Sequence, residues 1–164
     1  MFVDRSQGSA FDPALETLLI EGLERGPDIA VNQEFWETLQ AQSKRLVLAK
    51  TGVRPIKVAY HSQFRSPTPG TVIRRLGRMD ILKQFLRLLD ENAVSAGNQF
   101  IEAVAATVST LPKVPTMTVR VRRDLRLSNL RKWSVEGFER IRIYYVARGE
   151  GVRILRVLEP VKQA

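Results

Sequence analysis

Three consecutive strands are predicted in residues 130–158, which read LRKWSVEGFERIRIYYVARGEGVRILRVL. Apolar and aromatic residues alternate with arginine along 141–145, and Gly137 and Gly149-Glu150-Gly151 separate the strands. Such alternation between glycine-rich turns is typical of antiparallel hairpins. Arginine and lysine side chains lie between the β-forming residues. The segment is therefore either an ordinary half-buried sheet with hydrated arginines or a basic surface that faces a partner.

Two helices are predicted upstream of these strands, over residues 78–91 and up to Leu111-Pro112. Apolar residues recur at helical spacing in both. In the first they are Met79, Leu82, Phe85, Leu86 and Leu89. In the second they are Phe100, Ile101, Val104, Ala105 and Val108. Almost no loop separates the helices, so they form a helical hairpin. With short strands expected at 72–76 and 117–121, the fold class is α+β, a helical hairpin packed on a small antiparallel sheet.

The N-terminal residues 1–50 form a separate helical segment, here called the head. Asp12-Pro13 is a helix start, with Asp as N-cap and Pro in the first turn, and Gly26-Pro27-Asp28 ends this helix. Asn32 caps a second helix that carries Phe35 and Trp36. Two such helices cannot enclose a core alone. Either they dock on the rest of the chain with Phe35 and Trp36 as the anchor, or they simply belong to the main domain.

Residues 51–71 are interpreted as a linker, because prolines, glycine, serine and threonine punctuate them. Val58 and Tyr60 within it are compatible with an edge strand. His61, the single histidine, also lies there. It has no neighbouring ligand residues, and a metal or catalytic role is not expected for it. The domain organisation is then a head at 1–50, a linker at 51–71 and a body at 72–164.

Charge divides the chain in the same way. The formal net charge is +9, but residues 1–50 hold five basic and eight acidic side chains, whereas residues 113–164 hold thirteen and five. An acidic head and a basic body attract one another. The absence of cysteine fits a reducing compartment. Neither a signal peptide nor an apolar run of membrane-spanning length is visible, so a soluble cytoplasmic protein is expected.

The body resembles the ParE/RelE superfamily of bacterial toxins over about residues 72–162. The resemblance is carried by residues 100–104 with Leu111, Pro112 and Pro115, by LRKWSV at 130–135 followed by Gly137-Phe138, by RIYY at 142–145 and by ILRVL at 154–158. These segments are most similar to the ParE-like, plasmid-stabilisation branch. The family's fold is a strand, a helical hairpin and a β-meander, as the pattern also predicts.

Upstream, LETLLIEGLERGPDIAVNQEFW at 15–36 resembles the C-terminal part of a ParD-like antitoxin. In that family an N-terminal ribbon-helix-helix binds operator DNA and a helical tail wraps the toxin. Only eleven residues precede Asp12, too few for the DNA-binding part. The resemblance implies an antitoxin tail joined by a linker to its toxin. The residues expected to anchor this tail on the toxin are Leu19, Leu23, Phe35, Trp36 and Leu39.

The resemblance implies two activities. ParE-like members bind and inhibit DNA gyrase without a catalytic group. RelE-like members cleave ribosome-bound mRNA with a cluster of cations and an acid or base. The candidates for that cluster are Arg131, Arg142, Tyr145, Arg156 and Lys162. The candidates for a partner-binding surface are Arg131, Trp133, Phe138, Arg142, Tyr144 and Arg156. The segments LRKWSVEGF and RIYY are most similar to the ParE-like branch, and this similarity favours binding over catalysis.

The chain departs from the family at its end, where Leu158 is followed by Glu159-Pro160 instead of a His-Gly pair. A degenerate, inactive toxin–antitoxin fusion is therefore a further alternative. The expected partners are an antitoxin, either segment 12–50 in cis or a separate ParD-like protein, and DNA gyrase as target, with the ribosome and its mRNA as the alternative target. No cofactor, metal or membrane association is expected.

Overall fold

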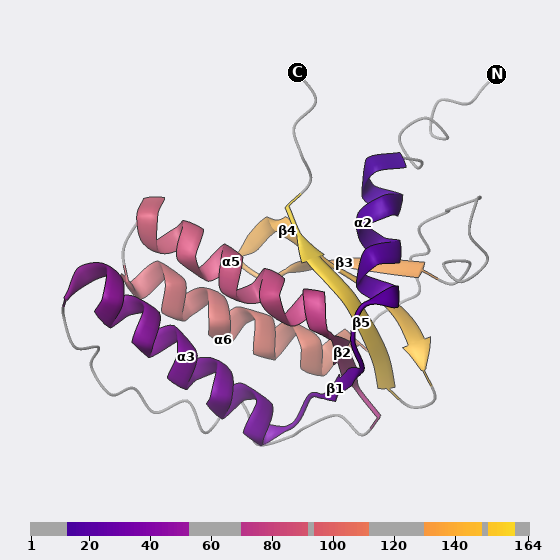
Figure 1. The fold of residues 1–164 in the computed structure, drawn as a ribbon, viewed down its shortest axis with the longest axis horizontal. Helices are drawn as coiled ribbons and strands as arrows, with labels where there is room; N and C mark the ends of the chain where they lie inside the picture. Colours follow the sequence, from indigo (N-terminus) through magenta and orange to yellow (C-terminus); the bar gives the residue numbers. More distant parts are fainter. Residues whose placement is uncertain (1–12, 53–69, 92–93, 112–129, 149–150, 160–164) are drawn as a thin grey trace.

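A computed structural model describes residues 13–52, 70–91, 94–111, 130–148 and 151–159, which form four helices and five strands (Figure 1). The helices are α2 (Pro13–Glu24), α3 (Gln33–Thr51), α5 (Arg75–Glu91) and α6 (Val94–Thr110). The strands are β1 (Asp28–Ala30), β2 (Val72–Arg74), β3 (Leu130–Val135), β4 (Phe138–Arg148) and β5 (Gly151–Leu158). The strands predicted at 117–121 and around Val58, as well as His61 and Lys162, lie outside the described residues.

The sheet has the strand order β1-β2-β5-β4-β3. The antiparallel β3–β4–β5 meander confirms the three predicted strands. The prediction of a purely antiparallel sheet is wrong, because β2 pairs with β5 in parallel. A parallel neighbour needs a long connection, and α5, α6, β3 and β4 all lie between these two strands in the sequence. The fold is thus α+β with a mixed five-stranded sheet.

The head contributes an edge strand that the sequence pattern did not predict. Residues Asp28–Ala30, of which only Asp28 was assigned a place in the prediction, at the end of the first helix, form β1 and pair antiparallel with β2. Asn32 then caps α3 as predicted, because its side-chain oxygen accepts a hydrogen bond from the Phe35 amide at 2.9 Å. At its other end α3 stops at Gly52, which adopts φ of 73°. The head therefore supplies both helices and a strand to the fold.

Helix α5 begins three residues earlier than predicted, directly after β2. Its core-facing stripe passes through Ile81, Phe85 and Leu88, all buried. Met79, which was expected on the apolar side, is 37% exposed. Ile81, Phe85 and Leu88 follow one another at spacings of three and four residues and so share the face that packs on the core. Met79 lies two positions before Ile81, about half a helical turn away, and therefore points away from that face.

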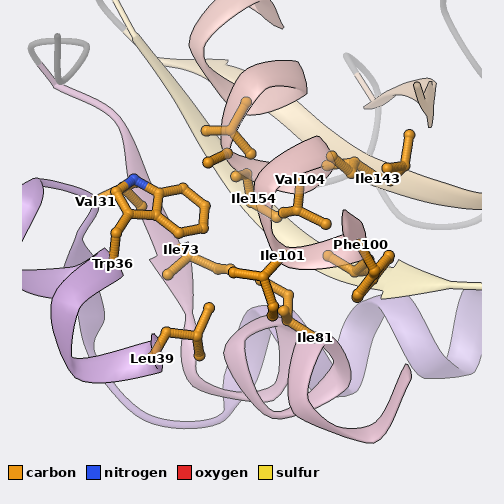
Figure 2. Packing of buried hydrophobic residues seen from close by; sticks show 14 of the residues in the cluster. Val31, Trp36, Leu39, Ile73, Ile81, Phe100, Ile101, Val104, Ile143 and Ile154 are labelled. Atoms are coloured by element: carbon orange, nitrogen blue, oxygen red, sulfur yellow. The ribbon is translucent and has the colours of Figure 1, made fainter. Parts of the chain in front are cut away.

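The main core lies between the sheet and the three helices α3, α5 and α6 (Figure 1). Figure 2 shows Trp36 and Leu39 of α3 directed toward Ile73 of β2 and Ile101 of α6. Phe35 and Trp36 also contact one another edge-on, with ring centroids 4.9 Å apart. Since both aromatic residues are buried in the same cluster as body residues, α3 is part of the main core. Within the described residues, no helix has both the length and the apolar character needed to cross a membrane.

Candidate functional site

An ion pair between Arg156 of β5 and Asp80 of α5 occupies a buried position beside the sheet. The Arg156 Nε and Nη2 groups donate to Asp80 Oδ2 and Oδ1 at 2.6 and 2.9 Å, and the two side chains are only 7% and 4% exposed. Asp80 Oδ2 also accepts from the Val157 amide at 3.1 Å. The register of β2 with β5 stops at Ile154, so Asp80 serves as a hydrogen-bond acceptor where β5 extends beyond its neighbouring strand. Bidentate charge-assisted bonds of this kind hold both groups in one geometry.

Helix α2 lies directly on this ion pair. Arg156 Nη1 donates to the Leu18 carbonyl at 3.0 Å. A Cβ atom at Gly22 would lie 2.7 Å from Arg156 Cδ and 2.9 Å from the Leu155 carbonyl oxygen. Both distances are too short for ordinary contact, and so the absence of a side chain at Gly22 is what permits α2 to approach β5 so closely.

A second apolar cluster holds α2 against the sheet, on the face opposite to the main core. Leu19 of α2 is fully buried there with Leu130, Tyr144 and Leu155. Tyr144 lies between Ile143 and Tyr145, which belong to the main core, and neighbouring residues of a strand point to opposite faces. Burying a leucine side chain stabilises a protein by about 2 kcal/mol. The half-buried residues packed around this cluster are Leu15, Ile20, Leu23, Val146 and Leu158.

Charged groups join the end of α2 to the body. Arg74 of β2 donates to the carbonyl oxygens of Gly22 at 3.1 Å and Arg25 at 3.2 Å, and also to that of Gly26. These are carbonyls at the helix C-terminus, where intrahelical donors run out. Arg74 Nη1 further donates to Asp28 Oδ1 at 2.9 Å, and Arg153 Nη2 donates to Asp28 Oδ2 at 3.1 Å. The acidic head and the basic body therefore meet in specific ion pairs.

The pKa of Asp28 reflects this arrangement. Partial burial by itself raises the pKa of the Asp28 carboxyl, but hydrogen bonds and positive charge from Arg74 and Arg153 outweigh it. The net result is a pKa below the ordinary value of 3.8. Asp28 is therefore ionised at neutral pH, and its charge strengthens the contact between β1 and the body.

The residues predicted to anchor the head divide into two groups. Leu19 and Leu23 of α2 belong to the smaller cluster on the outer sheet face. Phe35, Trp36 and Leu39 of α3 belong to the main core. Besides the pairing of β1 with β2, the head thus makes two apolar contacts with the body, and among the described residues of the head it is α2 that covers the outer face of the meander.

The six residues predicted to form a partner-binding surface do not share one exposed face. Trp133 and Phe138 pack on the main core, where Phe138 meets Phe100 edge-on at 5.5 Å. Tyr144 and Arg156, which are partners in the β4–β5 register, are buried. Arg156 is therefore not a hydrated arginine in this structure, because α2 and Asp80 cover it. The remaining members, Arg131 and Arg142, are half-buried.

The candidate ribonuclease residues do not converge either. Arg131 and Tyr145 are register partners on β3 and β4, and Tyr145 is buried in the main core. Burial raises the pKa of the Tyr145 hydroxyl, while the charge of Arg131 opposes that rise. Arg142 and Arg156 lie on the opposite face, and Lys162 is outside the described residues. The four described candidates are therefore distributed over both faces of the sheet.

A pocket of about 550 Å³ lies where β3 meets the end of α6. Lys132, Trp133 and Arg142 line it, together with Glu136 and Glu139 and with hydroxyl groups from α6 and β3. Burial, and then the charge of Arg142, lower the pKa of the Lys132 ammonium. Two cations and two carboxylates therefore share one concave surface at the outer edge of the sheet.

Several residues of this arrangement were not singled out by the sequence. Asp80 pairs with Arg156, and Gly22 lets α2 approach β5. The pair of Asp28 and Arg74 lies at the end of α2, and Lys132 lines the pocket beside β3. The one local signal was Asp80, a carboxylate next to Ile81 on the buried side of an amphipathic helix. Buried carboxylates are rarely unpaired, so a partner cation was to be expected, although its position was not.

Comparison with protein-family models found no match, and comparison with curated proteins found none either. Within the described ranges, no three His, Asp or Glu side chains are grouped so that they could hold a metal ion. Any function assigned to the chain therefore rests on the geometry of its site and on the residue patterns of its sequence.

Proposed function

We propose that this chain is a ParE-like toxin that acts by binding DNA gyrase and whose target-binding surface is covered by its own antitoxin-like helix α2. The observation that carries the proposal is the burial of Tyr144 and Arg156 beneath α2. These two residues belong to the segments that resemble the toxin, whereas α2 lies in the segment that resembles the antitoxin. The gyrase target rests on the resemblance of the body to the ParE-like branch.

The contacts of α2 fit a helix that can be released. Its cluster is small and separate from the main core, so its loss leaves α3, α5 and α6 packed on the sheet. Release would expose an apolar patch of Leu130, Tyr144 and Leu155 together with Arg156. A partially apolar surface that contains a tyrosine and an arginine has the composition of protein-binding hot spots.

The geometry favours binding over mRNA cleavage. A ribonuclease site needs its acid, base and charge-stabilising groups around one phosphate. Here Tyr145 is buried in the main core on one face of the sheet, and Arg156 on the other face is paired with Asp80. A binding surface requires no such convergence.

Growth on induced expression tests the proposal. The variant Leu19→Asp places a carboxylate in the α2 cluster and should release the helix. Its expression should therefore arrest growth, while expression of the unmodified chain should not. Leu48→Asp is the matched control, because Leu48 is 45% exposed on α3, and it should behave as the unmodified chain. Co-expression of residues 1–52 should restore growth. A folded Leu19→Asp protein that is harmless would contradict the proposal and favour a degenerate fusion.

A further inference from the structure

The two edges of the sheet differ. At one edge the head supplies β1, which pairs with β2. At the other edge lies β3, which pairs with β4 and with no second strand of the described chain (Figure 1). An unpaired edge presents backbone N–H and C=O groups that can pair with another extended chain. This edge stays open in the described structure while the head is docked.

The pocket beside β3 carries a pair of cations that have no acidic partner among the described residues. The side chains of Lys132 and Arg142 both line it, and neither side chain makes a hydrogen bond or an ion pair within the described part of the chain. Lys132 is paired with Tyr144 and Ser134 is paired with Arg142 in the β3–β4 register. Lys132 and Arg142 are therefore diagonal neighbours on adjacent strands. Two neighbouring, partly desolvated cations favour a carboxylate between them.

The other end of the same pocket is acidic. Glu136 and Glu139 lie at the β3–β4 turn, and the Glu136 amide donates to Thr107 Oγ1 of α6 at 3.1 Å. That bond ties the turn to α6 and fixes this end of the pocket. Trp133 adds apolar surface to the lining. The two ends of the pocket therefore carry opposite charge, which is positive at Lys132 and Arg142 and negative at the β3–β4 turn.

We propose that the outer edge of β3 binds an extended peptide segment of a partner protein, which adds to the sheet as a strand. The segment carries a carboxylate beside Lys132 and Arg142 and a cation beside Glu136 and Glu139. Lys132 and Glu136 are four positions apart, which corresponds to at most roughly 13 Å of extended chain. The acid and base of the peptide are therefore also about four positions apart. Main-chain pairing supplies affinity in this mode, and side-chain pockets supply specificity.

A nucleic acid fits the pocket less well. Each nucleotide brings a phosphate charge, and a strand that reached Lys132 and Arg142 would also meet the two glutamates. A peptide avoids this conflict because its charges alternate in sign. The inference goes beyond the proposed function, because the edge of β3 is separate from the surface that α2 covers, and it does not rest on that function. Peptide binding is measured without gyrase or growth, so either can fail alone.

The test uses the full chain and the fluorescently labelled peptide Val-Glu-Val-Thr-Val-Lys-Val, together with the same residues in reverse order. One order suits a parallel strand and the other an antiparallel one. We expect one of them to bind, and a version with threonine in place of both charged residues to bind at least tenfold more weakly. Methylation of alternate backbone nitrogens in the peptide should abolish binding, because it removes strand pairing but keeps the charges.

The double variant Lys132→Glu with Arg142→Glu should weaken binding at least tenfold. Lys83→Glu with Arg45→Glu makes the same charge change on the exposed surfaces of α5 and α3, and should leave binding unchanged. Binding that survives backbone methylation would overturn strand addition. Failure of both peptides would overturn the docking site, and so would a six-nucleotide RNA that binds in their place and depends on Lys132 and Arg142.

Discussion

Arg156 and Asp80 are 76 positions apart in the chain, yet their side chains form a bidentate ion pair with Nε–Oδ2 at 2.6 Å and Nη2–Oδ1 at 2.9 Å. Asp80 also accepts the Val157 amide, and Arg156 also donates to the Leu18 carbonyl. One buried pair therefore connects β5, α5 and α2. The structure of the body and the docking of the head depend on the same two side chains.

Removing the charge of Asp80 should destabilise the protein strongly. In Asp80→Asn the Arg156 guanidinium stays buried without a counter-charge, and breaking a buried pair in this way costs about 3 kcal/mol or more. Urea unfolding measures the change. Asp90→Asn is the control, because the Lys50–Asp90 pair is solvent-exposed, and it should change stability by less than about 1 kcal/mol. Equal losses of stability in the two variants would show that the buried pair contributes no more to stability than the exposed pair.

A methyl group at Gly22 should lift α2 from the sheet. Its Cβ would lie 2.9 Å from the Leu155 carbonyl oxygen, a backbone atom that cannot rotate away. Hydrogen exchange of α2 in Gly22→Ala should therefore accelerate at least tenfold, although alanine favours helix. Gly52→Ala serves for comparison, since a Cβ there would meet no described atom within 4 Å other than those of its neighbours in the chain. It should strain the end of α3 and leave exchange in α2 unchanged. Unaltered protection of α2 in Gly22→Ala would argue against close docking.

Acid should weaken the contact at Asp28. The folded-state pKa of Asp28 lies below its ordinary value of 3.8, so the stabilisation is fully present above that value and is lost as the pH falls through the lower, folded-state pKa. Asp28→Asn should therefore destabilise the protein at pH 7, and the difference from the unmodified chain should shrink below pH 3.8. Urea unfolding at a series of pH values measures it. A difference that does not vary with pH would mean that the charge of Asp28 is not involved.

The two groups of head anchors should respond differently to truncation. Leu19→Ala removes buried contacts from the α2 cluster and should accelerate exchange in α2 alone. Phe35→Ala with Trp36→Ala removes two aromatic rings from the main core, where each truncation costs about 3 kcal/mol or more, and should destabilise the whole protein. Hydrogen exchange resolved by segment distinguishes the two patterns. A double variant that loosens only residues 33–52 would indicate that α3 is not part of the main core.

The elements that could be predicted from the sequence are those encoded by local patterns. Alternation at 141–145 with Gly137 at the turn predicts β3 and β4, and apolar spacing predicts the helical hairpin. These signals involve neighbouring residues and need no knowledge of distant contacts. Strand β1 carries no such pattern in its three residues, and it exists because β2 offers an edge for pairing. The parallel β2–β5 pair is likewise a product of long-range packing.

The candidate site was harder to predict, because it depends on which face each side chain occupies. The register of β4 with β5 shifts between Tyr144 and Tyr145, and a bulge of this kind changes the alternation of side chains along a strand. Arg156 was expected on a partner-binding surface, and its pairing with Asp80 and with the Leu18 carbonyl was not predicted. Only the folded chain brings these residues together. Charge complementarity between head and body was predicted correctly in sign, while its location at Asp28, Arg74 and Arg153 was not.

Under the proposed function, α2 covers a surface through which the body binds its target. Gyrase supercoiling in the presence of purified protein tests it, with mRNA integrity in a translation mixture measured in parallel. Leu19→Asp should remain protected from exchange in its main core and should inhibit supercoiling at a concentration at least tenfold lower than the unmodified chain. The mRNA should stay intact. A folded variant that leaves supercoiling unaffected, or that cleaves mRNA instead, would contradict it.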